Sequence, residues 1–141
     1  MRVTESPIGA LLRAFDVLDA EAAIALFAPD GTVMTTFGEE ATGIDGVRRV
    51  IEALFAELRA TTHSVSAEWN PEPGVWIAEL SATYDLTDYS RRGPYKRAIV
   101  LRADNGRIAE LRMYGAHELR LSEGGRAYED VRGPHGWLPT L

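Results

Sequence analysis

The amino-acid sequence predicts an α+β fold in which helices come first and cover an antiparallel sheet. Two features of the 141-residue chain indicate this. Apolar residues recur at helical spacing up to Arg59, whereas from Thr61 onward they alternate with polar residues as they do along β-strands. Runs of helices followed by runs of strands are typical of this fold class, and the length suits a single domain.

Three helices are expected in the first part of the chain. Ser6 before Pro7 marks the first start, because a hydroxyl can cap the backbone and proline suits the first helical position. Asp19 is expected to cap a second, short helix over residues 20–27, which the turn sequence APDG would end. The third helix is expected over residues 45–59, where apolar residues form one stripe.

Five strands are expected, one between the second and third helices and four in a row after the third. The sequence GEEATGID is expected to be a loop, and DNG is a strong hairpin signal. The single domain would comprise residues 1–121, and the glycine- and proline-rich residues 122–141 would form an extended arm. The expected strands cover residues 32–37, 61–69, 75–88, about 95–103 and 108–121.

Composition disfavours several classes of function. The formal net charge of −6 opposes nucleic acid as a partner, and the lack of cysteine rules out thiolate chemistry and zinc–thiolate sites. No apolar run approaches the ~20 residues that span a bilayer, and Asp16 comes too early for a secretory leader. We therefore expect no membrane partner and a cytoplasmic location. The three histidines lack metal-ligand spacing, so no metal is expected, and a site of histidine and aspartate ligands is the alternative.

The strand TTHSVSAEW, residues 61–69, places an imidazole in line with apolar side chains. His63 shares one face with Val65, Ala67 and Trp69, so it is expected to point inward, either as a functional group or as a core histidine that only stabilises the fold. Small residues on the expected inner face would either leave room for a ligand cavity or pack closely against the helices. These small residues are Ala78, Ala82, Ala98 and Gly115.

Three segments together resemble the nuclear transport factor 2-like superfamily, in its SnoaL-like branch. They are LDAEAAIALFAPDGTV, TGIDGVRRVIEALF and NGRIAELRMYG, and the similarity covers roughly residues 8–120. The resemblance implies a curved antiparallel sheet that three helices wrap into a cone-shaped pocket, a cystatin-like α+β barrel. Members include ketosteroid isomerases, polyketide cyclases, epoxide hydrolases, dehydratases and non-catalytic binding modules, so the fold alone does not choose a function.

The resemblance disfavours the isomerase mechanism. The tyrosine and the two aspartates of ketosteroid isomerase fall on Leu11, Thr35 and Ala98, and none of these can abstract a proton. Cyclases and epoxide hydrolases of the family often carry an aspartate shortly after the RxY motif of the last strand. That aspartate is missing here, because RMY is followed by GAH.

The dehydratase branch matches better. Scytalone dehydratase-like proteins carry an aspartate late in the first helix, a second one three residues later, and a histidine early in the strand after the third helix. Asp16, Asp19 and His63 stand at these positions. The resemblance implies that His63 is the catalytic base and that Asp16 orients it, whereas Asp19 is better explained as a helix cap.

We therefore expect a small cofactor-free lyase or cyclase that acts by general acid–base chemistry on an apolar oxygenated metabolite. The alternative is a non-catalytic small-molecule-binding or dimerisation module of the same fold. The second histidine of scytalone dehydratase has no counterpart, and an acidic residue, Asp85 or Asp88, or the phenol of Tyr84 lies in that region instead. Substrate contacts are expected from Phe15, Thr35, Tyr84, Asp88, Met113 and His117.

A homodimer is also expected, because family members often pair across the outer face of their last strands. That face should mix apolar and polar side chains. The residues predicted for it are Arg97, Ile99, Leu101, Arg112 and Tyr114.

Overall fold

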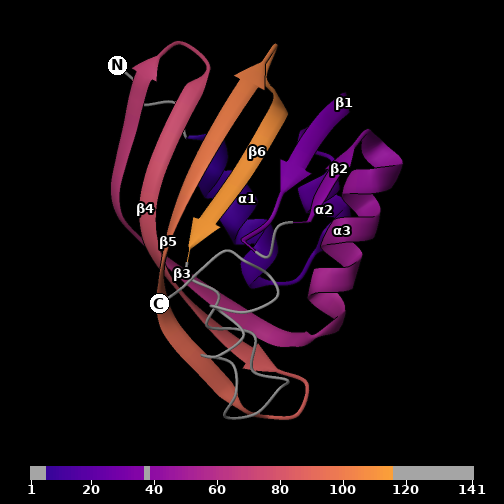
Figure 1. Ribbon diagram of the computed structural model, residues 1–141, viewed down its shortest axis with the longest axis vertical. Helices are drawn as coiled ribbons and strands as arrows, with labels where there is room; N and C mark the ends of the chain where they lie inside the picture. Colours follow the sequence, from indigo (N-terminus) through magenta and orange to yellow (C-terminus); the bar gives the residue numbers. More distant parts are fainter. Residues whose placement is uncertain (1–5, 37–38, 116–141) are drawn as a thin grey trace, which may run out of the picture.

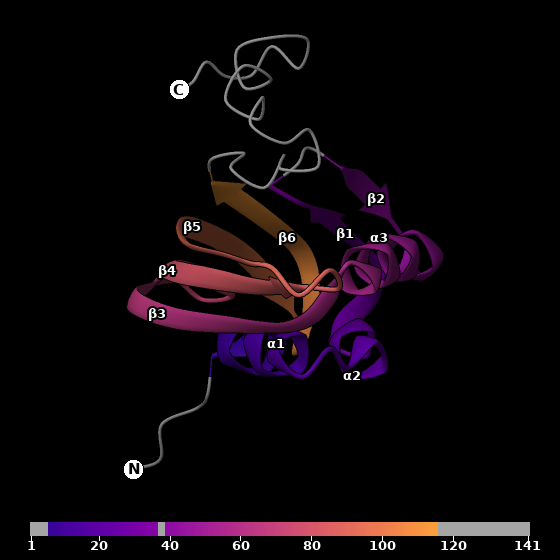
Figure 2. The ribbon, with the colours of Figure 1, turned by 90° about the horizontal axis from the view of Figure 1, so that it is seen from below.

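Three helices and a curved six-stranded sheet make up the described part of the chain, residues 6–36 and 39–115 of a computed structural model. Figure 1 shows how the elements are arranged, and Figure 2 shows α1 and α2 together on one side of the strands. The elements are α1 Pro7–Asp16, α2 Ala20–Ile24, β1 Phe27–Met34, β2 Glu40–Thr42, α3 Ile44–Ala56, β3 Leu58–Glu72, β4 Val75–Leu86, β5 Arg91–Asp104 and β6 Arg107–Gly115.

The strands follow one another in the order β2-β1-β6-β5-β4-β3. Neighbouring strands run antiparallel except β1 and β6, which are parallel. The sheet stays open, with β2 and β3 at its edges. The predicted α+β class with a curved, mainly antiparallel sheet is confirmed.

The helix starts follow the capping residues seen in the sequence. The Ser6 hydroxyl accepts a hydrogen bond from the backbone N–H of Ile8 at 2.9 Å, and the Asp19 carboxylate accepts one from Ala22 at 3.0 Å. The second helix is shorter than predicted, because Phe27 is buried and opens β1 by pairing with β6. The last part of the segment predicted as a helix therefore forms a strand, because it pairs with a strand far along the chain.

Two strand predictions were also wrong. Part of the expected loop GEEATGID forms the edge strand β2, which pairs with the second half of β1. The strand expected at about residue 95 begins at Arg91, where it pairs with Asp85 of β4. The predicted end of the last strand at residue 121 and the arm over residues 122–141 lie outside the described residues.

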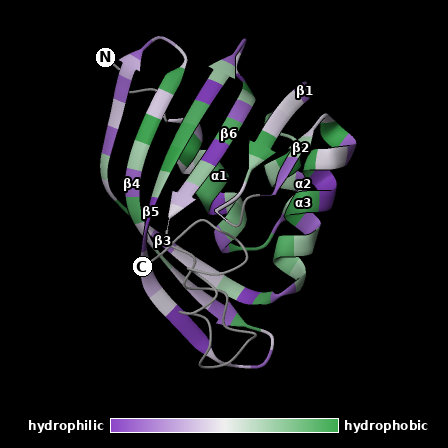
Figure 3. Cartoon of the chain, viewed as in Figure 1, coloured by the Kyte–Doolittle hydropathy of each residue, from purple (hydrophilic) through white to green (hydrophobic). Residues whose placement is uncertain are grey.

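The core lies between the helices and one face of the sheet. Figure 3 shows apolar and polar residues alternating along the strands, as expected where one face of a sheet is buried. The buried residues of β4 are Ala78, Leu80, Ala82 and Tyr84, the face that the sequence predicted. None of the helices among the described residues is long and apolar enough to cross a bilayer.

The predicted face of β5 was wrong. Arg97, Ile99 and Leu101 are buried on the core side, and Ala98 lies on the opposite face with the side chains that alternate with them. The register between β5 and β6 explains why this face of β5 is buried, because Leu101 pairs with buried Leu111 of β6. Small residues had suggested an inward Ala98, whereas the larger apolar residues determine which face is buried.

The far end of β3 also differs from the prediction. Val65 and Trp69, expected to be buried with His63, are 41% and 48% exposed. A register shift between Val65 and Ala67 interrupts the simple alternation of the strand. Burial on this face is therefore concentrated at the start of the strand, where Thr61 and His63 lie.

Candidate functional site

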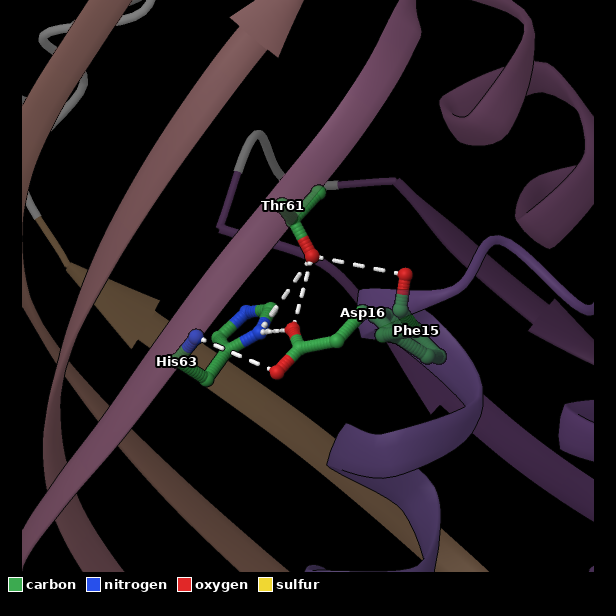
Figure 4. Close-up of polar contacts among 4 residues, drawn as sticks. All are labelled: Phe15, Asp16, Thr61 and His63. Carbon is green, nitrogen blue, oxygen red and sulfur yellow. Dashed lines mark hydrogen bonds and ion pairs between the residues drawn. The ribbon is translucent and has the colours of Figure 1, made fainter.

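A histidine and an aspartate from distant parts of the chain meet at the start of β3. The Nδ1 atom of His63 lies 2.6 Å from Oδ1 of Asp16, and the backbone N–H of His63 donates to Oδ2 at 3.4 Å (Figure 4). The His63 side chain is 8% exposed and that of Asp16 is 32% exposed. The pair is thus shielded on the histidine side and partly open to solvent on the carboxylate side.

Thr61 completes this group. Its hydroxyl lies on the same strand face as His63 and donates to Oδ1 of Asp16 at 2.9 Å (Figure 4). The backbone carbonyl of Phe15 is a second, longer acceptor at 3.3 Å. Because the threonine hydroxyl has one proton, the shorter contact to the charged acceptor is the stronger one.

The end of α1 positions the carboxylate. Asp16 is the last residue of this helix, and Leu18 then turns the chain with a φ of 56°. The backbone N–H groups of Leu18 and Asp19 donate to the carbonyls of Phe15 and Ala14, both at 2.9 Å, which closes the helix end. Asp16 is thereby held at the last turn, facing β3.

The contact with Asp16 selects a tautomer of His63. An ionised carboxylate only accepts hydrogen bonds, so Nδ1 must carry the proton in the 2.6 Å contact. In the neutral imidazole Nε2 then keeps a lone pair and can accept a proton. This division of roles suits a general base whose second nitrogen is fixed by a partner.

A small cavity adjoins His63. The space that the centre of a water molecule can occupy there is about 30 Å³, enough for roughly one or two waters. Helices α1 and α3 and the core face of the sheet contribute mostly apolar side chains to its wall. The lining residues are Leu11, Leu12, Phe15, Thr35, Thr36, Leu54, Leu58, Thr61, His63, Leu80, Tyr84, Arg97, Ile99 and Met113.

Most residues expected to contact a substrate meet at this cavity. Phe15, Thr35, Tyr84 and Met113 line it together with His63. The rings of Phe15 and Tyr84 lie on edge to the imidazole, with centroids 6.3 and 6.4 Å from it. Asp16 contacts His63 from outside the set of lining residues. The site thus combines the hydrogen-bonded pair of His63 and Asp16 with the aromatic rings of Phe15 and Tyr84.

The acidic residues near Tyr84 lie apart from this cavity. Asp88 is exposed in the turn after β4, where it accepts hydrogen bonds from the backbone and hydroxyl of Ser90 at 2.9 and 2.5 Å. Those hydrogen bonds lower the pKa of Asp88, and a hydrogen bond from Arg91 lowers the pKa of Asp85. Lowered pKa values keep both carboxyls ionised, which is unfavourable for a proton donor. His117 lies outside the described residues.

Arg97 is a lining residue that the sequence did not predict for the site. It is 6% exposed, and its guanidinium carbon lies 5.2 Å from the Tyr95 ring centroid and 5.9 Å from that of Tyr84. The available signal was the alternation of Arg97 with Ile99 and Leu101, which places all three on one face. Thr61 was missed as well, although it shares the strand face of His63.

Within residues 6–36 and 39–115, no three histidine, aspartate or glutamate side chains are grouped as metal ligands would be. Two of the three histidines of the chain lie beyond this part, at positions 117 and 135.

Comparison with known proteins identifies the family. The family model described as SnoaL-like domain matches residues 8–111. No curated protein sequence matches the chain. A structure from Catenulispora acidiphila, described as a hypothetical protein with ketosteroid isomerase-like fold in complex with trimethylamine, is similar with a TM-score of 0.75 at 18% identity, over 97% of this chain and 100% of that one.

Two further similar structures are of enzymes. A Mycobacterium tuberculosis epoxide hydrolase, described as LEH-like, has a TM-score of 0.66 at 15% identity, over 77% of this chain and 79% of that one. The epoxide hydrolase/cyclase-like enzyme SalBIII, named for a role in pyran ring formation in the polyether salinomycin, has a TM-score of 0.67 at 13% identity, over 77% and 87%. At these identities the likeness shows the fold.

Proposed function

Because the chain belongs to the SnoaL-like domain family, we propose that it is a small-molecule lyase or cyclase of the general acid–base type, with His63 as the base. One observation carries the proposal. The 2.6 Å contact between Nδ1 of His63 and Asp16 orients an imidazole whose other nitrogen can accept a proton, next to a largely apolar cavity. A general base of this kind contributes typically ~10²–10⁴ in rate.

The reaction that fits this group is elimination or ring closure at a β-hydroxy or related carbonyl compound. In the elimination, Nε2 of His63 takes the α-proton, and the C–H electron pair becomes the new C=C bond as the C–O bond breaks. The imidazolium, stabilised by Asp16, then returns the proton to the departing oxygen, which leaves as water. The step is redox-neutral, and the same residue serves as base and acid.

The environment of His63 supports an apolar, oxygenated substrate. Apolar side chains dominate the cavity wall, and Tyr84 and Thr35 contribute hydroxyl-bearing side chains to it. A ring-sized ligand needs more room than about 30 Å³, so side chains such as Met113 would have to move on binding. We propose no cofactor for this chemistry.

One observation favours the alternative, a non-catalytic binding module. Among the described residues no carboxylate lines the cavity, so the proton chemistry rests on His63 alone. A protein that had kept the pocket and lost the chemistry would also bind an apolar ligand. The two functions differ in whether a bound carbonyl compound loses its α-proton.

Proton exchange in D₂O separates the two functions. Wild-type protein is mixed with a panel of cyclic β-hydroxy ketones, and loss of the α-proton signal is followed by ¹H NMR. We expect faster exchange than in buffer for at least one member, and exchange lost in His63→Gln, which can keep a hydrogen bond to Asp16 but cannot take a proton. Asp30→Asn, a change at an exposed residue of β1, is the control. Binding without exchange would favour the binding module.

A further inference from the structure

We propose that Arg97 binds an anionic oxygen of the ligand, so that the natural ligand is a carboxylate or forms an enolate at this position. The inference rests on the proposed function in one respect, that the ligand occupies the cavity beside His63. It goes further by naming the charge of the ligand and the residue that binds the charged group. Three observations about Arg97 carry it.

The first observation is the burial of a permanent positive charge in the wall of the cavity. Arg97 is 6% exposed and lines the cavity together with His63. Arginine is rarely buried to this extent, because removing its charge from water is costly. A guanidinium placed in such a site interacts strongly with an anion, since the surrounding dielectric is low and its planar fork matches a carboxylate.

The second observation is that the position of the guanidinium is fixed. Nη1 donates to the backbone carbonyl of Lys96 at 3.1 Å, and the group lies over the rings of Tyr84 and Tyr95. On β6, the cross-strand partner of Arg97 is Gly115. A Cβ atom at Gly115 would lie 2.6 Å from Nη1 and 2.7 Å from Cδ of Arg97, so the arginine occupies space that only glycine leaves open.

The third observation is the placement of Arg97 relative to the base. The Tyr84 ring centroid lies 6.4 Å from the imidazole of His63 and 5.9 Å from the guanidinium carbon of Arg97. A ligand that packs along Tyr84 can therefore present a C–H bond to His63 and an oxygen to Arg97. The positive charge would stabilise the negative charge that develops on that oxygen when the proton leaves.

The test compares two probes of the same shape and different charge, benzoate and benzamide. Chemical-shift titration of ¹⁵N-labelled protein gives both the affinity and the residues affected. We expect benzoate to bind at the cavity at least about tenfold more tightly than benzamide, as a charge-assisted hydrogen bond provides. Arg97→Met should abolish this preference. Arg102→Met, the same change at an exposed residue of the same strand, should keep it.

Gly115→Ala supplies a second variant that keeps the charge and moves it. The added methyl group must displace the guanidinium, so the preference for benzoate should fall several-fold with net charge unchanged. This variant decides the question if Arg97→Met fails to fold. A wild-type protein that binds neither probe, or both alike, would overturn the inference. A preference that survives in folded Arg97→Met would overturn it too, and so would one that survives in Gly115→Ala if Arg97→Met does not fold.

His63→Gln separates this inference from the proposed function. The variant should keep the preference for benzoate while it loses α-proton exchange. If the preference depends on Arg97 but no carbonyl compound exchanges its proton, the catalytic proposal fails and the anion site stands. If exchange depends on His63 but Arg97→Met keeps the preference, the anion site fails alone.

Discussion

At the scale of single residues, the site depends on polar groups that satisfy one another at the edge of an apolar cavity. Asp16, the last residue of α1, accepts from the imidazole of His63 and from the hydroxyl of Thr61, which both lie in the first half of β3. Thr61 is buried, so its hydroxyl must find an acceptor inside the protein. We infer that Thr61 is a positioning residue that holds the carboxylate against the imidazole.

Thr61→Val tests this role. The variant keeps the shape of the side chain and removes the donor to Asp16, so the free energy of unfolding should fall by about 1 kcal/mol. Exchange rates that depend on His63 should fall too, because the carboxylate is held less firmly. Urea unfolding and the NMR exchange assay measure the two effects. Thr62→Val, the exposed neighbour on the other strand face, is the control, and equal effects at both sites would contradict the role of Thr61.

Part of this site could be predicted from the sequence, for identifiable reasons. Strand alternation placed His63 inward, and the resemblance to dehydratases paired it with Asp16. The predicted face of Arg97 was wrong, because that prediction followed the small residues and not the large apolar residues that alternate with Arg97. Which side of a strand is buried depends on its partner strand, and the register of β5 with β6 is a long-range property that local alternation does not reveal.

At the scale of elements, local signals predicted the helices better than the strands. Ser6 and Asp19 cap the first two helices as expected, since capping depends on neighbouring residues only. The early start of β1 at Phe27 depends on Ile108, which lies far along the chain. β2 forms by pairing with β1, so its three residues have no strong sequence pattern that would predict a strand.

The hairpin between β4 and β5 leads to a prediction about pH. Arg91 donates to Asp85 at 2.7 Å and lowers the pKa of this carboxyl below its ordinary value of 3.8. A lowered pKa in the folded state stabilises the hairpin above the unfolded pKa, and this stabilisation is lost as the pH falls through the folded pKa. We expect the Asp85 carboxyl carbon, followed by ¹³C NMR, to titrate below pH 3.8.

Arg91→Gln should raise the titration midpoint of Asp85 toward its ordinary value. Asp88 provides an internal control, because its pKa is lowered mainly by hydrogen bonds from Ser90. Its midpoint should stay nearly unchanged in the same variant. If wild-type Asp85 titrates above 3.8, or if its titration midpoint is the same in Arg91→Gln, the ion pair does not form in solution.

At the scale of the whole molecule, we propose that two copies pair through the outer face of the sheet. The correction to β5 changes which residues form this face. Ion pairs link Glu110 to Arg102 and Arg112, and Tyr114 is 41% exposed beside them. The surface still mixes apolar and charged groups, as many protein interfaces do.

Light scattering at tens of micromolar protein tests the proposed dimer. We expect twice the mass of one chain for the wild type, and a shift toward the monomer in Tyr114→Ser. Tyr89→Ser, the same change at an exposed turn between β4 and β5, should leave the mass unchanged. A wild-type protein that is monomeric at this concentration would exclude the pairing.

The central claim is that Asp16 fixes His63 as a base whose Nε2 is free to take a proton, and the tautomer of the imidazole tests it without any substrate. Two-dimensional ¹H–¹⁵N NMR of the imidazole signals at about pH 8, where an ordinary histidine is neutral, identifies the protonated nitrogen. His63→Gln assigns the signal by its disappearance. The account predicts a proton on Nδ1 and a bare Nε2 in the wild type, with this preference weakened in Asp16→Asn. A proton on Nε2 in the wild type would contradict it, because that nitrogen could then not act as the base.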